Sequence, residues 1–157
     1  MSEAVHSGQC RCGATRIQAT GAPLVTMACH CTGCQRMTGG AFSLSSFYPQ
    51  DRFKVTAGET IRGGVGTGPD HEFCPKCLSW MFTVAKQIEG FVNVRSTMFD
   101  DAPLHRPYLE TFRAEGLPDV ASGAPRSFAV FPPESEFGGL MADYAAVSYT
   151  HLPSPRD

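Results

Sequence analysis

Seven cysteines in three groups constrain this chain of 157 residues more than any other feature of its sequence. They follow the spacings C-x-C, C-x-C-x-x-C and C-x-x-C, at positions Cys10, Cys12, Cys29, Cys31, Cys34, Cys74 and Cys77. An odd number of cysteines cannot pair completely in internal disulfides. A C-x-x-C turn places two sulfurs about as far apart as two corners of a zinc tetrahedron, so the pattern favours metal ligation over disulfides.

Seven thiols divide naturally into a set of four and a set of three. Four thiolates make a closed structural zinc site, whereas three protein ligands with an open fourth position are typical of a catalytic zinc. The spacing alone does not assign cysteines to the two sets. The two C-x-x-C pairs would also suit an ordinary zinc ribbon, formed by Cys31, Cys34, Cys74 and Cys77.

The composition fits one folded domain with a hydrophobic core. Hydrophobic residues make up 42% of the chain and charged residues 18%, which is outside the disordered class. The net charge of −2 disfavours a phosphate-binding surface, so we expect no nucleic-acid partner. Segment 1–14 does not resemble a secretion signal, and no stretch approaches the roughly 18 apolar residues of a membrane span. We therefore expect a cytoplasmic protein that does not associate with membranes.

Hydrophobic patterning predicts a mostly β fold of antiparallel strands with long connections and little helix. Strands are expected within 14–21, 23–30, 41–49, 53–59, 79–85 and 90–99. One or two helical turns are expected in 32–40, ended by Gly39 and Gly40, and an amphipathic helix in 135–146. The glycine-rich segment 61–73 predicts a loop, and the segment 99–103 predicts a turn without a metal site. The tail 147–157 has no periodicity and is expected to be disordered or non-native.

Three motifs resemble the glutathione-dependent formaldehyde-activating (GFA) family, also called the centromere-protein-V-type GFA domain. They are GQCRCGAT, ACHCTGCQRMTGGAF and HEFCPKCLSWMF, with weaker support from GFVNVRSTMFDDA and GLPDVASGAPRSFAVFPPESEF. The resemblance covers roughly residues 6–146. It implies a single zinc-binding β-tent domain of antiparallel sheets folded over a structural metal.

The resemblance also implies two zinc ions per chain and assigns their ligands. The structural zinc would be held by Cys10, Cys12, Cys74 and Cys77. The second zinc would be held by Cys29, Cys31 and Cys34, which are therefore also the candidate catalytic residues. His30 lies between two of these cysteines, but alternation along a strand points its side chain away from them, so we favour a non-ligand role.

The resemblance places candidate glutathione contacts just after the second cysteine group, at Arg36, Gly39 and Gly40. Arg36 belongs to a Gln-Arg pair where the family usually has two arginines. Leu78 replaces the glycine that usually follows the last cysteine, and Asp119 stands where related sequences often have tryptophan. The departures at the Gln-Arg pair and at Asp119 concern substrate contacts, whereas the departure at Leu78 concerns the geometry of the turn.

The implied activity is that of a carbon–sulfur lyase of the S-(hydroxymethyl)glutathione synthase type, joining glutathione or a similar thiol to a small aldehyde such as formaldehyde. A free thiol titrates near about 8.5 and is mostly protonated at neutral pH, and zinc with an open position favours the thiolate. The alternative is a non-catalytic zinc module with a structural or interaction role. A fourth protein ligand at the second site, for instance His30, would favour this alternative.

Overall fold

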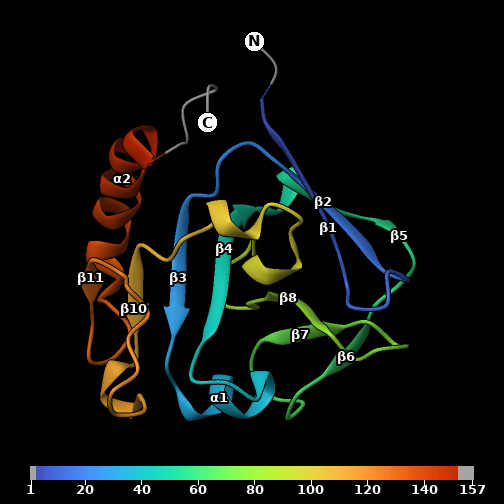
Figure 1. Cartoon of the computed structure of the whole chain (residues 1–157), viewed down its shortest axis with the longest axis horizontal. Helices are drawn as coiled ribbons and strands as arrows, with labels where there is room; N and C mark the ends of the chain where they lie inside the picture. Colours follow the sequence, from blue (N-terminus) through green and yellow to red (C-terminus); the bar gives the residue numbers. More distant parts are fainter. Residues whose placement is uncertain (1–2, 152–157) are drawn as a thin grey trace.

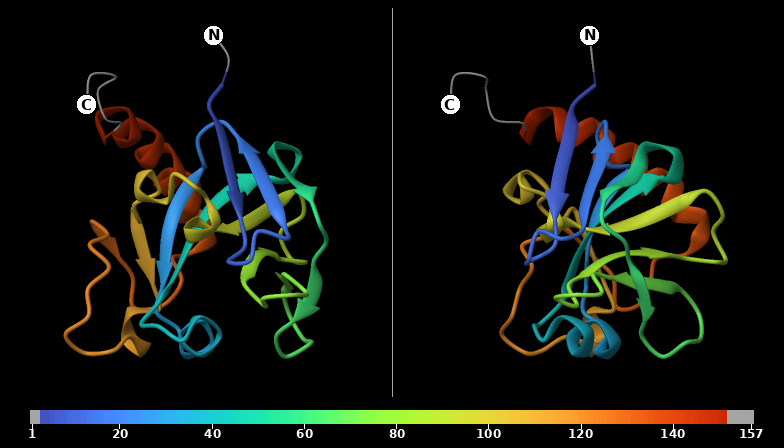
Figure 2. Two further views of the ribbon diagram at one scale, coloured as in Figure 1. Left: turned by 45° about the vertical axis from the view of Figure 1, so that its right-hand side comes forward. Right: turned by 90° about the vertical axis from the view of Figure 1, so that its right-hand side faces the viewer.

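The computed structural model describes residues 3–151 and the side chains of residues 3–147. Its strands form a three-stranded and an eight-stranded sheet that lie at an angle to each other (Figures 1 and 2). The smaller sheet contains β1 (Val5–Gln9), β2 (Arg16–Thr20) and β5 (Phe53–Ala57). The larger contains β3 (Val25–Cys29), β4 (Ser43–Pro49), β6 (Ile61–Gly63), β7 (Asp70–Phe73), β8 (Trp80–Val84), β9 (Phe91–Arg95), β10 (Leu109–Thr111) and β11 (Arg126–Ser127).

The prediction of a mostly β fold built from antiparallel strands is confirmed. The larger sheet has the order β11-β10-β3-β4-β9-β8-β7-β6, and every pair from β3 to β6 is antiparallel. One edge differs from the expectation, because β10 runs parallel to both β3 and β11. The sheet is therefore mixed rather than purely antiparallel.

Two hydrophobic clusters lie on opposite faces of the larger sheet, as the alternation of side chains along its strands requires. The cluster between the two sheets includes Ile17 of β2, Tyr48 of β4 and Val94 of β9. The cluster on the other face includes Val25, Met27, Phe47, Leu109 and Leu140. Cys29 and Arg95 belong to this second face, by the register described below.

In Figure 1, helix α1 (Thr32–Thr38) lies below the lower ends of β3 and β4, whereas helix α2 (Glu134–His151) lies beside β10 and β11. Helix α1 ends at Gly39, which has a left-handed φ of 67°, as the sequence predicted. Helix α2 covers the second cluster with Phe137, Leu140 and Met141. It begins one residue earlier than predicted and continues to His151, so residues 147–151 are helical rather than irregular. Residues 152–157 lie outside the described residues.

Within residues 3–151, four short 3-10 helices connect the strands: η1 (Gln50–Arg52), η2 (Ser96–Met98), η3 (Ala102–Leu104) and η4 (Arg113–Glu115). The prediction that 61–73 is a loop is wrong, because β6 and β7 form a hairpin there. Phe73 stacks on Trp80 of the next strand, with ring centroids 6.4 Å apart. The glycines of 64–68 occupy the turn, and the flanking residues form the strands.

Candidate functional site

The structure divides the seven cysteines into a quartet and a trio, all as free thiols. The quartet joins the turn after β1, which carries Cys10 and Cys12, to the turn after β7, which carries Cys74 and Cys77. The trio contains Cys29, Cys31 and Cys34. This grouping is the one implied by the family resemblance, and the zinc-ribbon grouping that combined cysteines from both sets is not found.

The quartet has the dimensions of a tetrahedral zinc site. All four sulfurs lie within 4.8 Å of one another. The Sγ atoms of Cys10 and Cys12 are 3.6 Å apart, and those of Cys12 and Cys74 are 3.9 Å apart. With zinc–sulfur bonds of about 2.3 Å, the edge of the tetrahedron is about 3.8 Å. Cys10 and Cys74 are buried, Cys77 is half-buried and Cys12 is exposed. Four thiolate donors at these distances suit a closed structural ion.

Leu78, which stands where the family resemblance implies a glycine, has a left-handed backbone conformation. Its φ is 60°, in the left-handed region, and its N–H donates to the carbonyl oxygen of Cys74 over 2.9 Å. The side chain is 63% exposed, so no buried contact offsets the backbone strain. Asp119, the other departure from the family pattern noted above, also has a left-handed φ, of 63°. The turn that presents Cys74 and Cys77 is therefore closed by a backbone hydrogen bond with leucine at this position.

The trio is assembled by the end of β3 and the start of α1. Cys29 is the last residue of β3, and Cys31 is the N-cap of α1, where its Sγ accepts a hydrogen bond from the N–H of Cys34 at 3.3 Å. All three cysteines are half-buried, and all three sulfurs lie within 4.8 Å of one another. Among residues 3–147, no fourth His, Cys, Asp or Glu joins this group.

The thiols of the trio differ in acidity. A hydrogen bond from Cys34, opposed by burial, lowers the pKa of Cys29 to about 5. The same contact, together with burial, raises the pKa of Cys34. Burial also raises the pKa of Cys31. The trio thus stabilises negative charge at Cys29, as expected of a group of thiols that can accept a cation.

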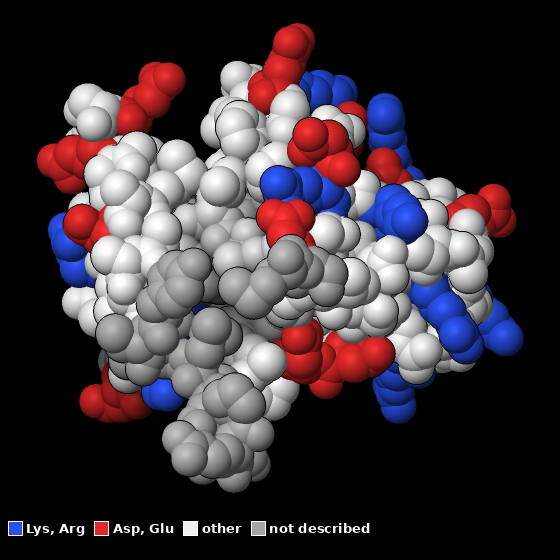
Figure 3. All heavy atoms as spheres, turned by 90° about the horizontal axis from the view of Figure 1, so that it is seen from above, with Lys and Arg blue, Asp and Glu red and all other residues white. Residues whose placement is uncertain are grey.

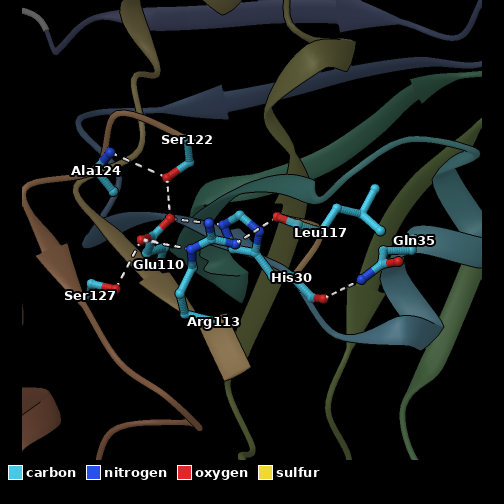
Figure 4. A network of polar contacts seen from close by, with 8 residues as sticks. All are labelled: His30, Gln35, Glu110, Arg113, Leu117, Ser122, Ala124 and Ser127. Carbon is cyan, nitrogen blue, oxygen red and sulfur yellow. Dashed lines mark hydrogen bonds and ion pairs between the residues drawn. The ribbon is translucent and has the colours of Figure 1, made fainter. Parts of the chain in front are cut away.

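His30 lies between Cys29 and Cys31 in the sequence but does not belong to the group of candidate metal ligands. Its Nε2 is 2.8 Å from Oε2 of Glu110 on β10, and its side chain is completely buried. Figure 4 shows Glu110 receiving further hydrogen bonds from Ser122 at 2.6 Å and Ser127 at 2.9 Å. Gln35 of α1 donates to the carbonyl oxygen of His30 at 2.7 Å. The network fixes the backbone between Cys29 and Cys31.

Arg95 is the residue of this site that sequence reasoning missed. Cys29 pairs with Ser43 across β3 and β4, and Ser45 pairs with Arg95 across β4 and β9. Since opposed residues share a face and positions two apart along a strand do too, Cys29, Ser43 and Arg95 lie on one face. The sequence analysis placed Arg95 in a predicted strand but did not place it near the trio. The register between strands that are distant in sequence cannot be predicted from local patterns.

The surroundings of Arg95 suit a counter-ion for the trio. Its side chain is only 6% exposed, its guanidinium carbon lies 4.0 Å from the Trp80 ring centroid, and its Nε has no hydrogen-bond partner among the described residues. No carboxylate of residues 3–147 forms an ion pair with it. Burial lowers the pKa of Arg95 to about 10, while the charges of Cys34 and Cys29 act to raise it.

The three candidate substrate contacts lie on or just beyond α1. Arg36 is exposed on the helix, and Gly39 and Gly40 are exposed at its C-terminal end. They are therefore accessible to a ligand approaching the trio from this side. Figure 3 shows acidic and basic side chains intermixed on the face seen from above, in keeping with the small net charge of −2.

Comparison with known proteins places the chain in a family. Residues 5–115 match the family described as glutathione-dependent formaldehyde-activating enzyme, so the chain belongs to the GFA family. A comparison with curated proteins finds no match. A crystal structure of a Rhodobacter sphaeroides protein is similar at 17% identity and a TM-score of 0.48, over 78% of this chain and 98% of that one. Within the described part of the chain, neither helix combines the length and hydropathy needed to cross a bilayer.

Replacing Glu110 with glutamine tests whether its network stabilises the fold. Burial opposes ionisation of Glu110, but hydrogen bonds from Ser122 and Ser127 outweigh it and lower the pKa below 4.5. A lowered pKa means that the carboxylate stabilises the folded state above pH 4.5, and that this contribution is lost on acidification. Glu110→Gln should therefore lower the free energy of unfolding at pH 7 by about 1–3 kcal/mol in urea titrations.

The matched control is Glu89→Gln, at an exposed glutamate, which should leave stability unchanged. The difference between wild type and Glu110→Gln should shrink as the pH falls below about 4.5. Equal stability of the two proteins at pH 7 would show that the buried network contributes nothing.

Replacing Arg95 with methionine tests its role as counter-ion. The substitution keeps a long apolar side chain against Trp80 but removes the positive charge beside the trio. In the variant, a competing chelator should remove zinc from the trio at about ten-fold lower free chelator concentration than in the wild type. Zinc bound by the quartet should be unaffected. Arg16→Met, at an exposed arginine, is the control. Unchanged zinc affinity with altered stability would show that Arg95 serves only the fold.

Proposed function

We propose that both cysteine groups bind zinc, giving two ions per chain with different roles. The spacing of the quartet sulfurs, at 3.6 and 3.9 Å, supports a closed zinc site with four thiolate ligands that holds the fold together. The trio is half-buried and has three protein donors rather than four. A zinc ion held there by Cys29, Cys31 and Cys34 would leave one position for a substrate.

The observation that carries the function is this half-buried trio with three donors in a chain of the GFA family. When bound, zinc would supply a Lewis-acidic position that favours the thiolate form of a substrate thiol. Three thiolates give the occupied site a net charge of −1, and a substrate thiolate adds another negative charge. The buried guanidinium of Arg95 offsets this charge without any reorganisation during the reaction.

The reaction proposed is the addition of a thiol to a small aldehyde. The substrate sulfur forms a bond to the carbonyl carbon, the carbon–oxygen double bond becomes single, and the proton of the thiol ends on the new hydroxyl oxygen. No electrons are gained or lost overall, so no redox cofactor is needed. Glutathione and formaldehyde are the substrates we propose first, because the family is described by them.

Substrate orientation is assigned to the end of α1. Arg36 would pair with a carboxylate of a peptide thiol, and the exposed Gly39 and Gly40 allow a peptide backbone to approach closely. These contacts, added to the fixed position of the trio, would hold the sulfur near the aldehyde. Catalysis would then come mainly from positioning and deprotonation.

A second candidate function has one observation in its favour. A cavity of about 450 Å³ lies between the segment 103–108 and α2, and none of the trio cysteines lines it. A trio that lies apart from this cavity also suits a non-catalytic zinc module that binds a partner. The enzyme remains the first proposal because no fourth protein ligand closes the trio among the described residues.

The activity is tested by following exchange between formaldehyde and its glutathione adduct by NMR, with and without protein. The zinc-loaded wild type should accelerate exchange over the spontaneous reaction. Cys31→Ser should abolish the acceleration, because it removes one trio thiolate. The serine hydroxyl still accepts the hydrogen bond from the N–H of Cys34, so α1 keeps its N-cap.

The control is the zinc content of the variant, which should fall only by the ion of the trio. Wild-type protein with two zinc ions and no effect on exchange would exclude this activity and favour the non-catalytic module. Full acceleration by Cys31→Ser would show that the reaction does not take place at the trio.

A further inference from the structure

A third group of potential metal ligands lies away from all seven cysteines. It consists of His6 on β1 and of Asp101 and His105 on either side of η3, with one ligand atom of each residue within 4.8 Å of the others. Nδ1 of His6 is 2.6 Å from Oδ2 of Asp101, and Nε2 of His105 is 3.2 Å from Oδ1. Each carboxylate oxygen therefore faces one imidazole nitrogen.

The backbone holds the two halves of this group together. Gly8 of β1 forms a bridge with Phe99, and the N–H of Asp100 donates to the carbonyl oxygen of Ser7 at 2.9 Å. A Cβ atom at position 8 would overlap the Met98 carbonyl oxygen, so the close approach requires glycine. This contact brings His6 opposite Asp101, although the two are 95 residues apart in sequence.

The ring of His105 is held by stacking and by hydrogen bonds. It stacks on Phe99, with centroids 4.6 Å apart and an interplanar angle of 12°. Its Nδ1 is 2.9 Å from Oγ of Ser46, which is itself 2.9 Å from Oγ of Ser96, and both serines are buried. If Nδ1–H donates to Ser46, Nε2 is left with its lone pair toward Asp101. Metal-binding histidines are commonly oriented in this way, by a hydrogen bond from the ring nitrogen that does not bind the metal.

From this geometry we propose that His6, Asp101 and His105 form a binding site for a divalent first-row transition metal. Two imidazoles and one carboxylate are a borderline donor set, which suits Zn²⁺, Fe²⁺ or Co²⁺ and differs from the thiolate sets of the cysteines. The ion would replace the proton between Nδ1 of His6 and Asp101, and would bind the lone pair of Nε2 of His105. The site goes beyond the proposed lyase function and does not depend on it.

The position of the group leaves room for further ligands. His6 and His105 line the cavity of about 450 Å³ beside α2, together with mostly apolar residues. The side chain of His105 is 2% exposed, and those of His6 and Asp101 are 13% and 31% exposed. A metal held by three protein atoms therefore has space nearby for water or a small ligand.

The test is a Co²⁺ titration of the full chain after its thiolate sites have been filled with Zn²⁺. The wild type should take up one further Co²⁺ per chain, with visible d–d absorption, no sulfur-to-cobalt charge-transfer band and no release of zinc. Asp101→Asn and His105→Gln should each weaken this binding by at least about ten-fold. Asp101→Asn keeps the shape of a partly exposed side chain, so it remains informative if the buried His105→Gln fails to fold.

Two matched variants are the controls. Asp100→Asn changes the neighbouring exposed aspartate, and His71→Gln changes a histidine whose Nδ1 lies 2.9 Å from Oγ1 of Thr83. Both should bind Co²⁺ as the wild type does. The proposal is overturned if Co²⁺ does not bind, if it binds only by displacing zinc, or if folded Asp101→Asn binds it with unchanged affinity. In each of these cases the three side chains serve only to link β1 to the segment around η3 through hydrogen bonds.

Discussion

The convergence of four sulfurs from two distant turns is the interaction on which the rest of the structure depends. The turn after β1 belongs to the smaller sheet and the turn after β7 to the larger, so the quartet joins the two sheets. Cys12 and Cys74 are 62 residues apart, and closing so long a loop has a large entropic cost in the unfolded chain. Free thiols contribute little against that cost, whereas a structural zinc ion contributes strongly to folding.

The trio shares no cysteine with the quartet, but its position depends on the larger sheet that the quartet joins to the smaller one. Its cysteines sit where β3 passes into α1, and the buried network around Glu110 holds the backbone between them. Strand β9 supplies Arg95, whose side chain forms no ion pair with a carboxylate among the described residues. The sheet thus places a buried cation on the same face as Cys29, the one thiol of the trio with a lowered pKa, which is an arrangement that favours anionic sulfur.

The sequence predicted the parts of this molecule that local patterns encode. Alternation together with aromatic and β-branched content located β2, β3, β4, β5, β8 and β9, whereas β1, β10 and β11 were not predicted. Gly39 marked the end of α1, and the cysteine motifs gave the family and, through it, the two groups. The β6–β7 hairpin was missed because its turn glycines dominate the local composition. Arg95 and the group of His6, Asp101 and His105 were missed for a different reason. They depend on strand register and on a close contact at Gly8, and neither leaves a spacing motif in the sequence.

The most direct test of the account is to compare Cys74→Ala with Cys34→Ala by native mass spectrometry and thermal unfolding. Cys34→Ala should lose one zinc ion and unfold cooperatively close to the wild-type temperature. Cys74→Ala should lose the zinc of the quartet together with its cooperative transition. If Cys74→Ala keeps a wild-type transition, or if both variants unfold equally, the quartet is not what holds the two sheets together.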